Sequence, residues 1–239
     1  FGIAFDPNIA KGEMNYLHWS PPKVGVEKLL QEFKERDIEN ISIIQENSHG
    51  PQSVLDEILL QTESNSDVSI NTIESYQPGE KDFRSILTKV TEKSSDIYVL
   101  LGFPPQLEIL TRQIKELDKK IPLTTILYFE LSQQKELFED QWYVSQSPAN
   151  DTFLKEFKDY TGKDALVGAP NGYDIFNIIV TATELIKEKN ISSKNIHKEI
   201  QKIGTYYGVL GQLIIPSSGI IESAAYIKII KDAKPMFIK

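Results

Sequence analysis

The sequence predicts an α/β protein with a doubly wound parallel sheet. Short runs rich in β-branched residues alternate with amphipathic helical runs along most of the chain, and this alternation is typical of a parallel sheet covered by helices on both faces. The chain has 239 residues, of which 40% are hydrophobic and 25% are charged. It is therefore long enough to bury one large core or two smaller ones.

Four strand–helix repeats are expected in the first part of the chain, after an opening helix at 24–36. In each repeat a buried apolar run precedes a segment whose apolar residues recur every three or four positions. The expected strands are 40–45, 67–76, 96–101 and 121–127, and the helices that follow them are 51–63, a helix from about 82, 104–118 and 131–139. A short strand at 142–145 closes this part, which has the pattern of one doubly wound half.

The character of the sequence changes after Pro148. Three helical segments follow one another with no strand between them, at 151–160, 172–188 and 192–203. Strand-like runs then return at 212–215, 225–230 and 235–238. Because the helical block interrupts the strand–helix alternation, we expect a discontinuous domain organisation.

Composition excludes several classes of function. Acidic residues outnumber basic ones by 34 to 26, for a net charge of -8, which disfavours binding to nucleic acid or to an anionic membrane. The chain has no cysteine, so it has no disulfide, thiol nucleophile or thiolate metal site. Its three histidines lack metal-ligand spacing, and no phosphate-binding glycine loop occurs. We therefore expect no enzyme activity, catalytic residue, metal or cofactor.

A turn lies between the second expected strand and its helix. Pro78 and Gly79 suit the two central positions of a type II turn, because proline fixes the first φ and glycine accepts a positive second one. Asp82 lies where a carboxylate caps a helix start. The alternative is that Glu80 and Asp82 form a catalytic acid–base pair, but we interpret the stretch as a corner.

Several short motifs follow one another along nearly the whole chain. They are IIQENSHG at 43–50, ESYQPGEKDF at 74–83, SDIYVLLG at 95–102 with the Phe-Pro-Pro that follows, FKDYTGKD at 157–164, GYD at 172–174, GVLG at 208–211 and a closing strand pair around 226–234. This ordered set resembles the type I periplasmic binding proteins, in particular the Leu/Ile/Val-binding-protein-like receptors of branched-chain amino acid ABC importers.

The resemblance implies two α/β lobes joined by three crossing strands, with a ligand trapped between the lobes when the hinge closes. On that plan, 1–20 and 148–205 form a partial first lobe with the hinge, and 21–147 and 206–239 form a complete second lobe. The opening strand–helix units of the first lobe have no counterpart, and we expect that something upstream of Phe1 has been removed. We also expect an N-terminal segment, a partner chain or a second copy to cover the apolar faces of the helices at 151–203.

Ligands of open α/β sheets bind beyond the carboxyl ends of the strands, which selects the loops 46–50, 102–105 and 128–130. In the resembled family these loops contact the ligand, and His49 and Phe103 fall near positions that commonly carry an aromatic. Glu130 falls near the carboxylate that meets an amino acid's ammonium group. The expected ligand-binding residues are His49, Ser48, Phe103, Pro104, Tyr128 and Glu130. Their alternatives are a polar turn residue for His49, a core residue for Phe103 and a helix-start acid for Glu130.

The resemblance therefore implies a non-enzymatic solute-binding protein of an ABC importer. It would bind a small polar ligand such as an amino acid, dock to the importer's membrane subunits, and lie in the periplasm or another extracytoplasmic space. Two alternatives remain open at this stage. One is a ligand-sensing regulatory module on the same fold, and the other is a lone-lobe protein that works through interaction or dimerisation.

Overall fold

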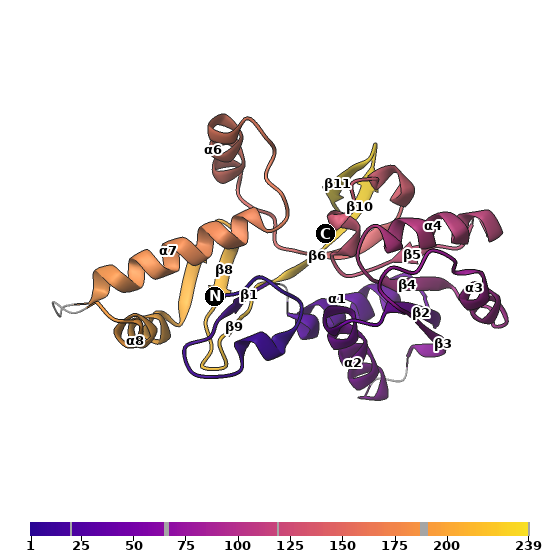
Figure 1. The fold of residues 1–239 in the computed structure, drawn as a ribbon, viewed down its shortest axis with the longest axis horizontal. Helices are drawn as coiled ribbons and strands as arrows, with labels where there is room; N and C mark the ends of the chain where they lie inside the picture. The colour runs from indigo at the N-terminus through magenta and orange to yellow at the C-terminus, as the bar shows by residue number, and fades with distance from the viewer. Residues whose placement is uncertain (20, 65–66, 119, 187–190, 239) are drawn as a thin grey trace. The chain divides into compact units, whose positions relative to one another are not determined.

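The chain divides into two compact units. The computed structural model describes residues 1–19, 21–64, 67–118, 120–186 and 191–238, which Figure 1 labels by element. Unit 1 comprises Phe1–Val24 and Gln146–Ala224, and unit 2 comprises Gly25–Ser145 and Ala225–Lys239. This division differs from the sequence-based one, because 206–224 group with unit 1 and not with 21–147. The reason is a shared core, since Leu210, Leu213 and Ile215 pack with Ile178 and Ile200.

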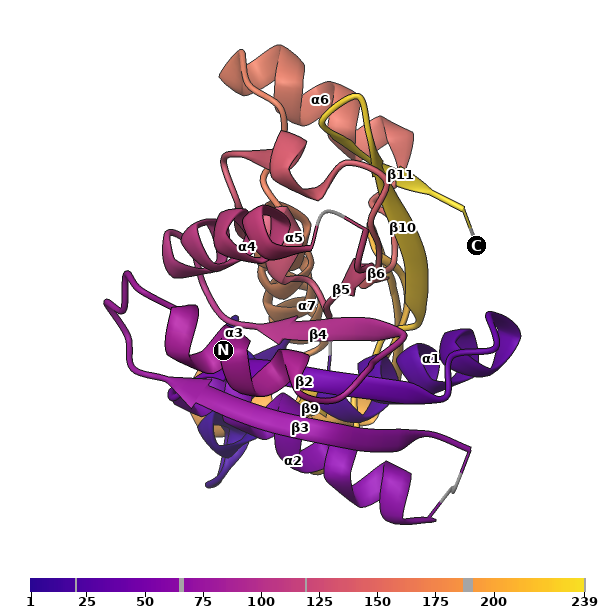
Figure 2. The same ribbon diagram turned by 90° about the vertical axis from the view of Figure 1, so that its right-hand side faces the viewer.

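A four-stranded parallel sheet forms the centre of unit 2. Its strands, in spatial order, are β3 (Ser69–Tyr76), β2 (Asn40–Glu46), β4 (Ile97–Leu101) and β5 (Leu123–Thr124), and each neighbouring pair is parallel. Figure 2 shows β3, β2 and β4 side by side. Nearly every residue of β2 and β4 is buried, as expected for strands covered on both faces. The predicted α/β class with a parallel sheet is confirmed.

Helices alternate with these strands as the apolar spacing predicts. They are α1 (Pro22–Glu35), α2 (His49–Ser64), α3 (Arg84–Thr91) and α4 (Gln106–Leu117). Each buries one face, whose residues include Val26, Leu29 and Phe33; Val54 and Ile58; Leu87 and Val90; and Leu107, Leu110 and Ile114. α2 contacts β2 and β4, and α3 contacts β3. The 3.6-residue period of an amphipathic helix explains why these helices could be predicted from the sequence.

The fourth repeat is more irregular than predicted. β5 contains only two residues, Leu123 and Thr124, and Leu127, three positions beyond its end, has a φ of 68°. The expected helix at 131–139 is replaced by α5 (Tyr128–Leu131) and a 3₁₀ turn, η2 (Lys135–Phe138). A second, smaller sheet then joins β6 (Trp142–Gln146), β10 (Ala225–Lys231) and β11 (Lys234–Phe237) in the order β11-β10-β6.

Unit 1 is mainly helical in the part that the structure describes. It contains a 3₁₀ turn, η1 (Pro7–Ala10), and the helices α6 (Asp151–Thr161), α7 (Ala169–Leu185) and α8 (Ser193–Ile203). Two pairs of short strands complete it: β1 (Leu17–His18) with β9 (Ile220–Ile221), and β7 (Thr205–Gly208) with β8 (Gly211–Ile214). α7 contacts α8. The helix predicted at 172–188 ends at Leu185 in the described residues, and its last two predicted positions lie outside them.

A buried carboxylate joins α7 to the β7–β8 hairpin. Asp174 accepts hydrogen bonds from the backbone N–H groups of Val209, at 2.7 Å, and Leu210, at 3.2 Å. Its Oδ2 also lies 3.9 Å from Nε2 of His18, and both side chains are buried. A Cβ at Gly208 would lie 2.3 Å from Oδ1 of Asp174. Glycine at this position therefore lets the hairpin approach the carboxylate.

The apolar faces of the unit 1 helices are only partly buried. Phe153, Ile178 and Ile200 lie in the interior. Large apolar side chains nevertheless remain exposed on these segments, namely Leu154, Tyr160, Tyr173, Phe176 and Leu185. The expectation that a further segment or chain covers these helices stays a prediction.

Candidate functional site

Three adjacent strand ends meet at the carboxyl edge of the unit 2 sheet. Glu46 is the last residue of β2 and pairs with Tyr76, the last residue of β3. On the other side Gln45 pairs with Leu101 of β4, so Gly102 follows level with Glu46. Three consecutive parallel strands thus present a carboxylate, a phenol and a glycine where open α/β sheets bind ligands.

Gly102 makes room for the Tyr76 side chain. A Cβ at this glycine would lie 2.0 Å from Oη of Tyr76 and 3.3 Å from Cβ of Glu46. The Tyr76 hydroxyl therefore lies over Gly102 and beside Glu46. This hydroxyl is buried and has no hydrogen-bond partner among the described residues. An unpaired buried hydroxyl costs free energy, so this edge of the sheet is a candidate ligand site.

Glu46 lies in the same buried environment as two tyrosines. Its side chain is 5% exposed and accepts a hydrogen bond from Oγ of Ser48 at 3.0 Å. Burial raises the pKa of Tyr76, and the charge of Glu46 raises it further. Burial likewise raises the pKa of Tyr128, with contributions from Glu46 and then Tyr76. Both phenols therefore stay protonated at neutral pH, next to a carboxylate.

The structure brings part of the predicted residue set to this place. Ser48 bonds to Glu46, and the ring of Phe103 meets that of Tyr128 edge to face, with centroids 5.2 Å apart. Pro104 follows Phe103 and joins Pro105 through a cis peptide bond. His49 is exposed as the first residue of α2. The role of each of these residues in binding stays a prediction.

Glu130 lies in a second cluster, where its carboxylate forms an ion pair with Lys228. Its Oε1 accepts hydrogen bonds from Nζ of Lys228 at 2.8 Å and from Oγ of Ser145. The side chains of Lys228 and Glu130 are 10% and 9% exposed. The ammonium also lies 4.4 Å from the centre of the Phe237 ring. Burial, followed by the charge of Glu130, raises the pKa of Tyr143.

Glu80 and Asp82 are confirmed as residues of a corner. The Glu80 N–H donates to the Gln77 carbonyl at 3.1 Å, and Gly79 has a φ of 91°, as a type II turn requires. Asp82 accepts hydrogen bonds from the side chain and backbone of Arg84, which lowers its pKa to about 2. A group that stays ionised at neutral pH cannot act as a general acid.

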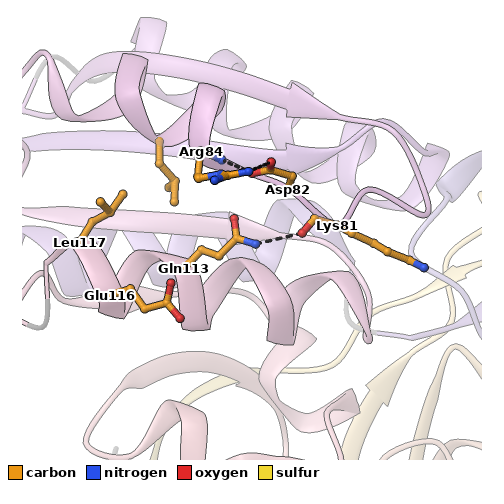
Figure 3. A pocket seen from close by; sticks show the side chains of 7 residues that line it. Lys81, Asp82, Arg84, Gln113, Glu116 and Leu117 are labelled. Carbon is orange, nitrogen blue, oxygen red and sulfur yellow. Dashed lines mark hydrogen bonds and ion pairs between the residues drawn. The ribbon is translucent and has the colours of Figure 1, made fainter.

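A cavity of about 370 Å³ lies beside this corner. Figure 3 shows that Asp82 and Arg84 pair with each other in its wall, and that Gln113 of α4 points to the Lys81 carbonyl. Gln113 also accepts from the Phe83 N–H at 2.7 Å. These polar groups bond to one another and attach the corner to α4, so they have a structural role that requires no ligand in the cavity.

Gln113→Ala is expected to destabilise unit 2 by about 1–2 kcal/mol, because it removes both bonds that link α4 to the corner and leaves the Phe83 N–H unpaired. Urea unfolding followed by circular dichroism would measure the change. Glu116→Ala, at an exposed position on the same helix, is the control. Equal stability of the two variants would contradict the linking role of Gln113.

The predicted residue set lacks Glu46, Tyr76, Ser145 and Lys228, although Glu46 begins one of the selected loops. The sequence indicates Tyr76 only as the end of a strand, and its place beside Glu46 depends on the register of β3 with β2. Lys228 lies 98 positions from Glu130, and Ser145 reaches Glu130 from another strand. The ends of neighbouring parallel strands were a usable signal for Tyr76. No sequence signal pointed to Lys228.

No protein-family model and no curated protein matches this sequence. Solved structures do match. A branched-chain amino acid transporter substrate-binding protein from Streptococcus pneumoniae, in complex with isoleucine, superposes with a TM-score of 0.80 at 18% identity over 95% of this chain and 67% of that one. A periplasmic binding protein type 1 from Bordetella pertussis gives 0.82 at 17% identity, over 99% and 72%. A solute-binding protein of an ABC transporter from R. palustris, in complex with benzoate, gives 0.82 at 10% identity, over 98% and 68%.

This chain has the type I periplasmic-binding-protein fold. The resemblance found in the sequence motifs is thus confirmed at the level of fold. The chain spans 67% to 72% of the length of these three proteins. Within the periplasmic-binding-protein fold, unit 2 supplies a parallel sheet whose carboxyl edge carries Glu46, Tyr76 and Gly102. No described helix has the length and apolar character needed to cross a membrane.

Proposed function

We propose that this chain acts as the solute-binding component of an ABC importer and binds a small polar ligand such as an amino acid. The observation that carries the proposal is the buried carboxylate–tyrosine cluster at the carboxyl edge of a type I periplasmic-binding-protein sheet. Proteins of this fold with isoleucine or leucine bound support the ligand class. The proposed location is extracytoplasmic, and the proposed partners are the membrane subunits of the importer.

The proposed mechanism is binding by hinge closure, with no covalent chemistry. A ligand that contacts both lobes favours the closed state by its difference in affinity for the two states. The proposed hinge lies where the chain passes between its two units, at 24–25, 145–146 and 224–225, and the unit boundaries support this placement. No cofactor is needed for this function, because binding and closure use only side chains and backbone groups.

A ligand screen tests the proposal. L-Isoleucine, L-leucine or benzoate at about 100 times its dissociation constant should stabilise the chain by about 2.7 kcal/mol. For a protein of this size, that corresponds to a rise of roughly 5–10 °C in Tm. Thermal shift would measure the rise, isothermal titration calorimetry would confirm it, and glucose serves as the control solute. Shifts no larger than the glucose shift for all amino acids and small carboxylic acids would contradict the proposal.

The exposed apolar residues of unit 1 favour a second candidate, an interaction or dimerisation protein. Tyr160 is 92% exposed and Phe176 is 64% exposed, and surfaces of this kind commonly mark contact sites. Sedimentation equilibrium would discriminate the two functions. A mass that doubles with concentration, together with no ligand-induced shift in Tm, would favour this second candidate.

A further inference from the structure

We infer that Glu46, and not Glu130, receives the cationic group of the ligand. The inference rests on the proposed solute-binding function and assigns the residue that would pair with the ammonium group of an amino acid ligand. Glu46 was inside the loop 46–50 selected from the sequence, but it was not among the residues chosen to contact the ligand.

The first argument is charge balance at Glu46. Its side chain is 5% exposed, and no ion pair within 4 Å involves it among the residues that the structure describes. Its one side-chain hydrogen bond there comes from the neutral hydroxyl of Ser48. A buried carboxylate without a cation carries a desolvation penalty. A ligand ammonium at this place would remove that penalty.

The second argument is the composition of the surroundings. The unpaired Tyr76 hydroxyl lies beside Glu46 and offers a second acceptor to an ammonium group, which has three N–H donors. Burial and then the charge of Glu46 raise the pKa of the Tyr128 phenol, and the Tyr128 ring contacts that of Phe103. A carboxylate and a free phenol oxygen together match an alkylammonium better than an anion.

The third argument is the contrast with Glu130. Its burial is similar, at 9% exposed, yet Lys228 already supplies an ammonium at 2.8 Å. The charge of Glu130 is thus balanced from within unit 2. A second cation there would meet the repulsion of Lys228 and would have to displace it. The two carboxylates therefore have different roles, one satisfied by the protein and one left for the ligand.

Calorimetry on the full chain with two probes tests the inference. L-Leucine carries an ammonium group, and 4-methylpentanoate has the same carbon skeleton without it. The parent chain should bind L-leucine and bind 4-methylpentanoate at least tenfold more weakly. Glu46→Gln keeps the shape and the acceptor for Ser48 but removes the charge, and it should weaken L-leucine binding by about 30-fold or more. Glu116→Gln, at an exposed position, should change it less than threefold.

A measurement without ligand separates a binding role from a structural one. Because Glu46 is buried without a cation, Glu46→Gln should stabilise the ligand-free chain and lower its unfolding equilibrium constant by about tenfold. A destabilised Glu46→Gln would show that the carboxylate supports the fold and would overturn the inference. L-Leucine affinity in Glu46→Gln within threefold of the parent value would overturn it as well.

The outcomes also separate this inference from the proposed function. If the parent chain binds 4-methylpentanoate or benzoate but not L-leucine, solute binding stands and the assignment of an ammonium ligand fails. If neither probe nor any other small amino acid or carboxylic acid binds, the proposed function fails and the inference fails with it.

Discussion

Lys228→Met is expected to lower the free energy of unfolding of unit 2 by about 3–5 kcal/mol, because it leaves the Glu130 carboxylate buried without its cation. The ammonium of Lys228 lies 2.8 Å from Oε1 of Glu130, and both side chains are at least nine-tenths buried. Methionine retains most of the side-chain length, so the loss would come mainly from the charge. Urea unfolding followed by tryptophan fluorescence would report it, since Trp142 begins β6 of the same sheet as Lys228.

A double-mutant cycle isolates the pair from the two side chains. Adding Glu130→Gln to Lys228→Met should restore much of the lost stability, because two neutral groups replace one unpaired charge. Lys231→Met is the matched control, since its ion pair with Asp140 is half exposed, and such pairs contribute little. If Lys228→Met and Lys231→Met had the same urea midpoint, Lys228 would not be needed to balance the buried charge of Glu130.

Asp174→Ala is expected to destabilise unit 1 by about 2–5 kcal/mol, because the N–H groups of Val209 and Leu210 would lose their acceptor. The Asp174 carboxylate bonds to both at 2.7 Å and 3.2 Å and lies against the buried His18. Hydrogen–deuterium exchange would show faster exchange across the β7–β8 hairpin than in the parent.

Asp159→Ala, on the exposed side of α6, should leave the exchange of that hairpin unchanged. An Asp174→Ala variant whose hairpin amides exchange at the parental rate would mean that backbone contacts alone hold the hairpin. Faster exchange of the hairpin amides in Asp174→Ala is the outcome that the packing favours. The hairpin approaches the carboxylate so closely at Gly208 that a side chain there would overlap it.

Local patterns in the sequence were enough to predict most of unit 2. The apolar spacing of α2 and α4 and the uninterrupted apolar run of β4 can be recognised from residues close together in the chain. The turn at Pro78-Gly79 was predictable for the same reason, because each residue restricts its own φ. The positive φ of Gly79 bears this out.

Features set by distant residues were beyond the sequence. The early end of β5 at Thr124 and the grouping of 206–224 with unit 1 depend on how segments pack, and no local preference encodes them. The candidate site shows the same limit. The loop that begins with Glu46 was predictable, but the difference in charge balance between Glu46 and Glu130 depends on Lys228, which lies far away in sequence.

The chain passes between its two units three times, and these passages constrain the order in which the units can fold. Residues 1–24 of unit 1 meet their partners in 146–224 only when the stretch Gly25–Ser145 brings its two ends together. For an unfolded stretch this closure has an entropic cost that grows with the logarithm of its length. Once unit 2 has folded, its ends are held at a fixed separation and most of that cost has already been met. Destabilising unit 2 should therefore slow the folding of unit 1, even where the substituted residue makes no contact with it.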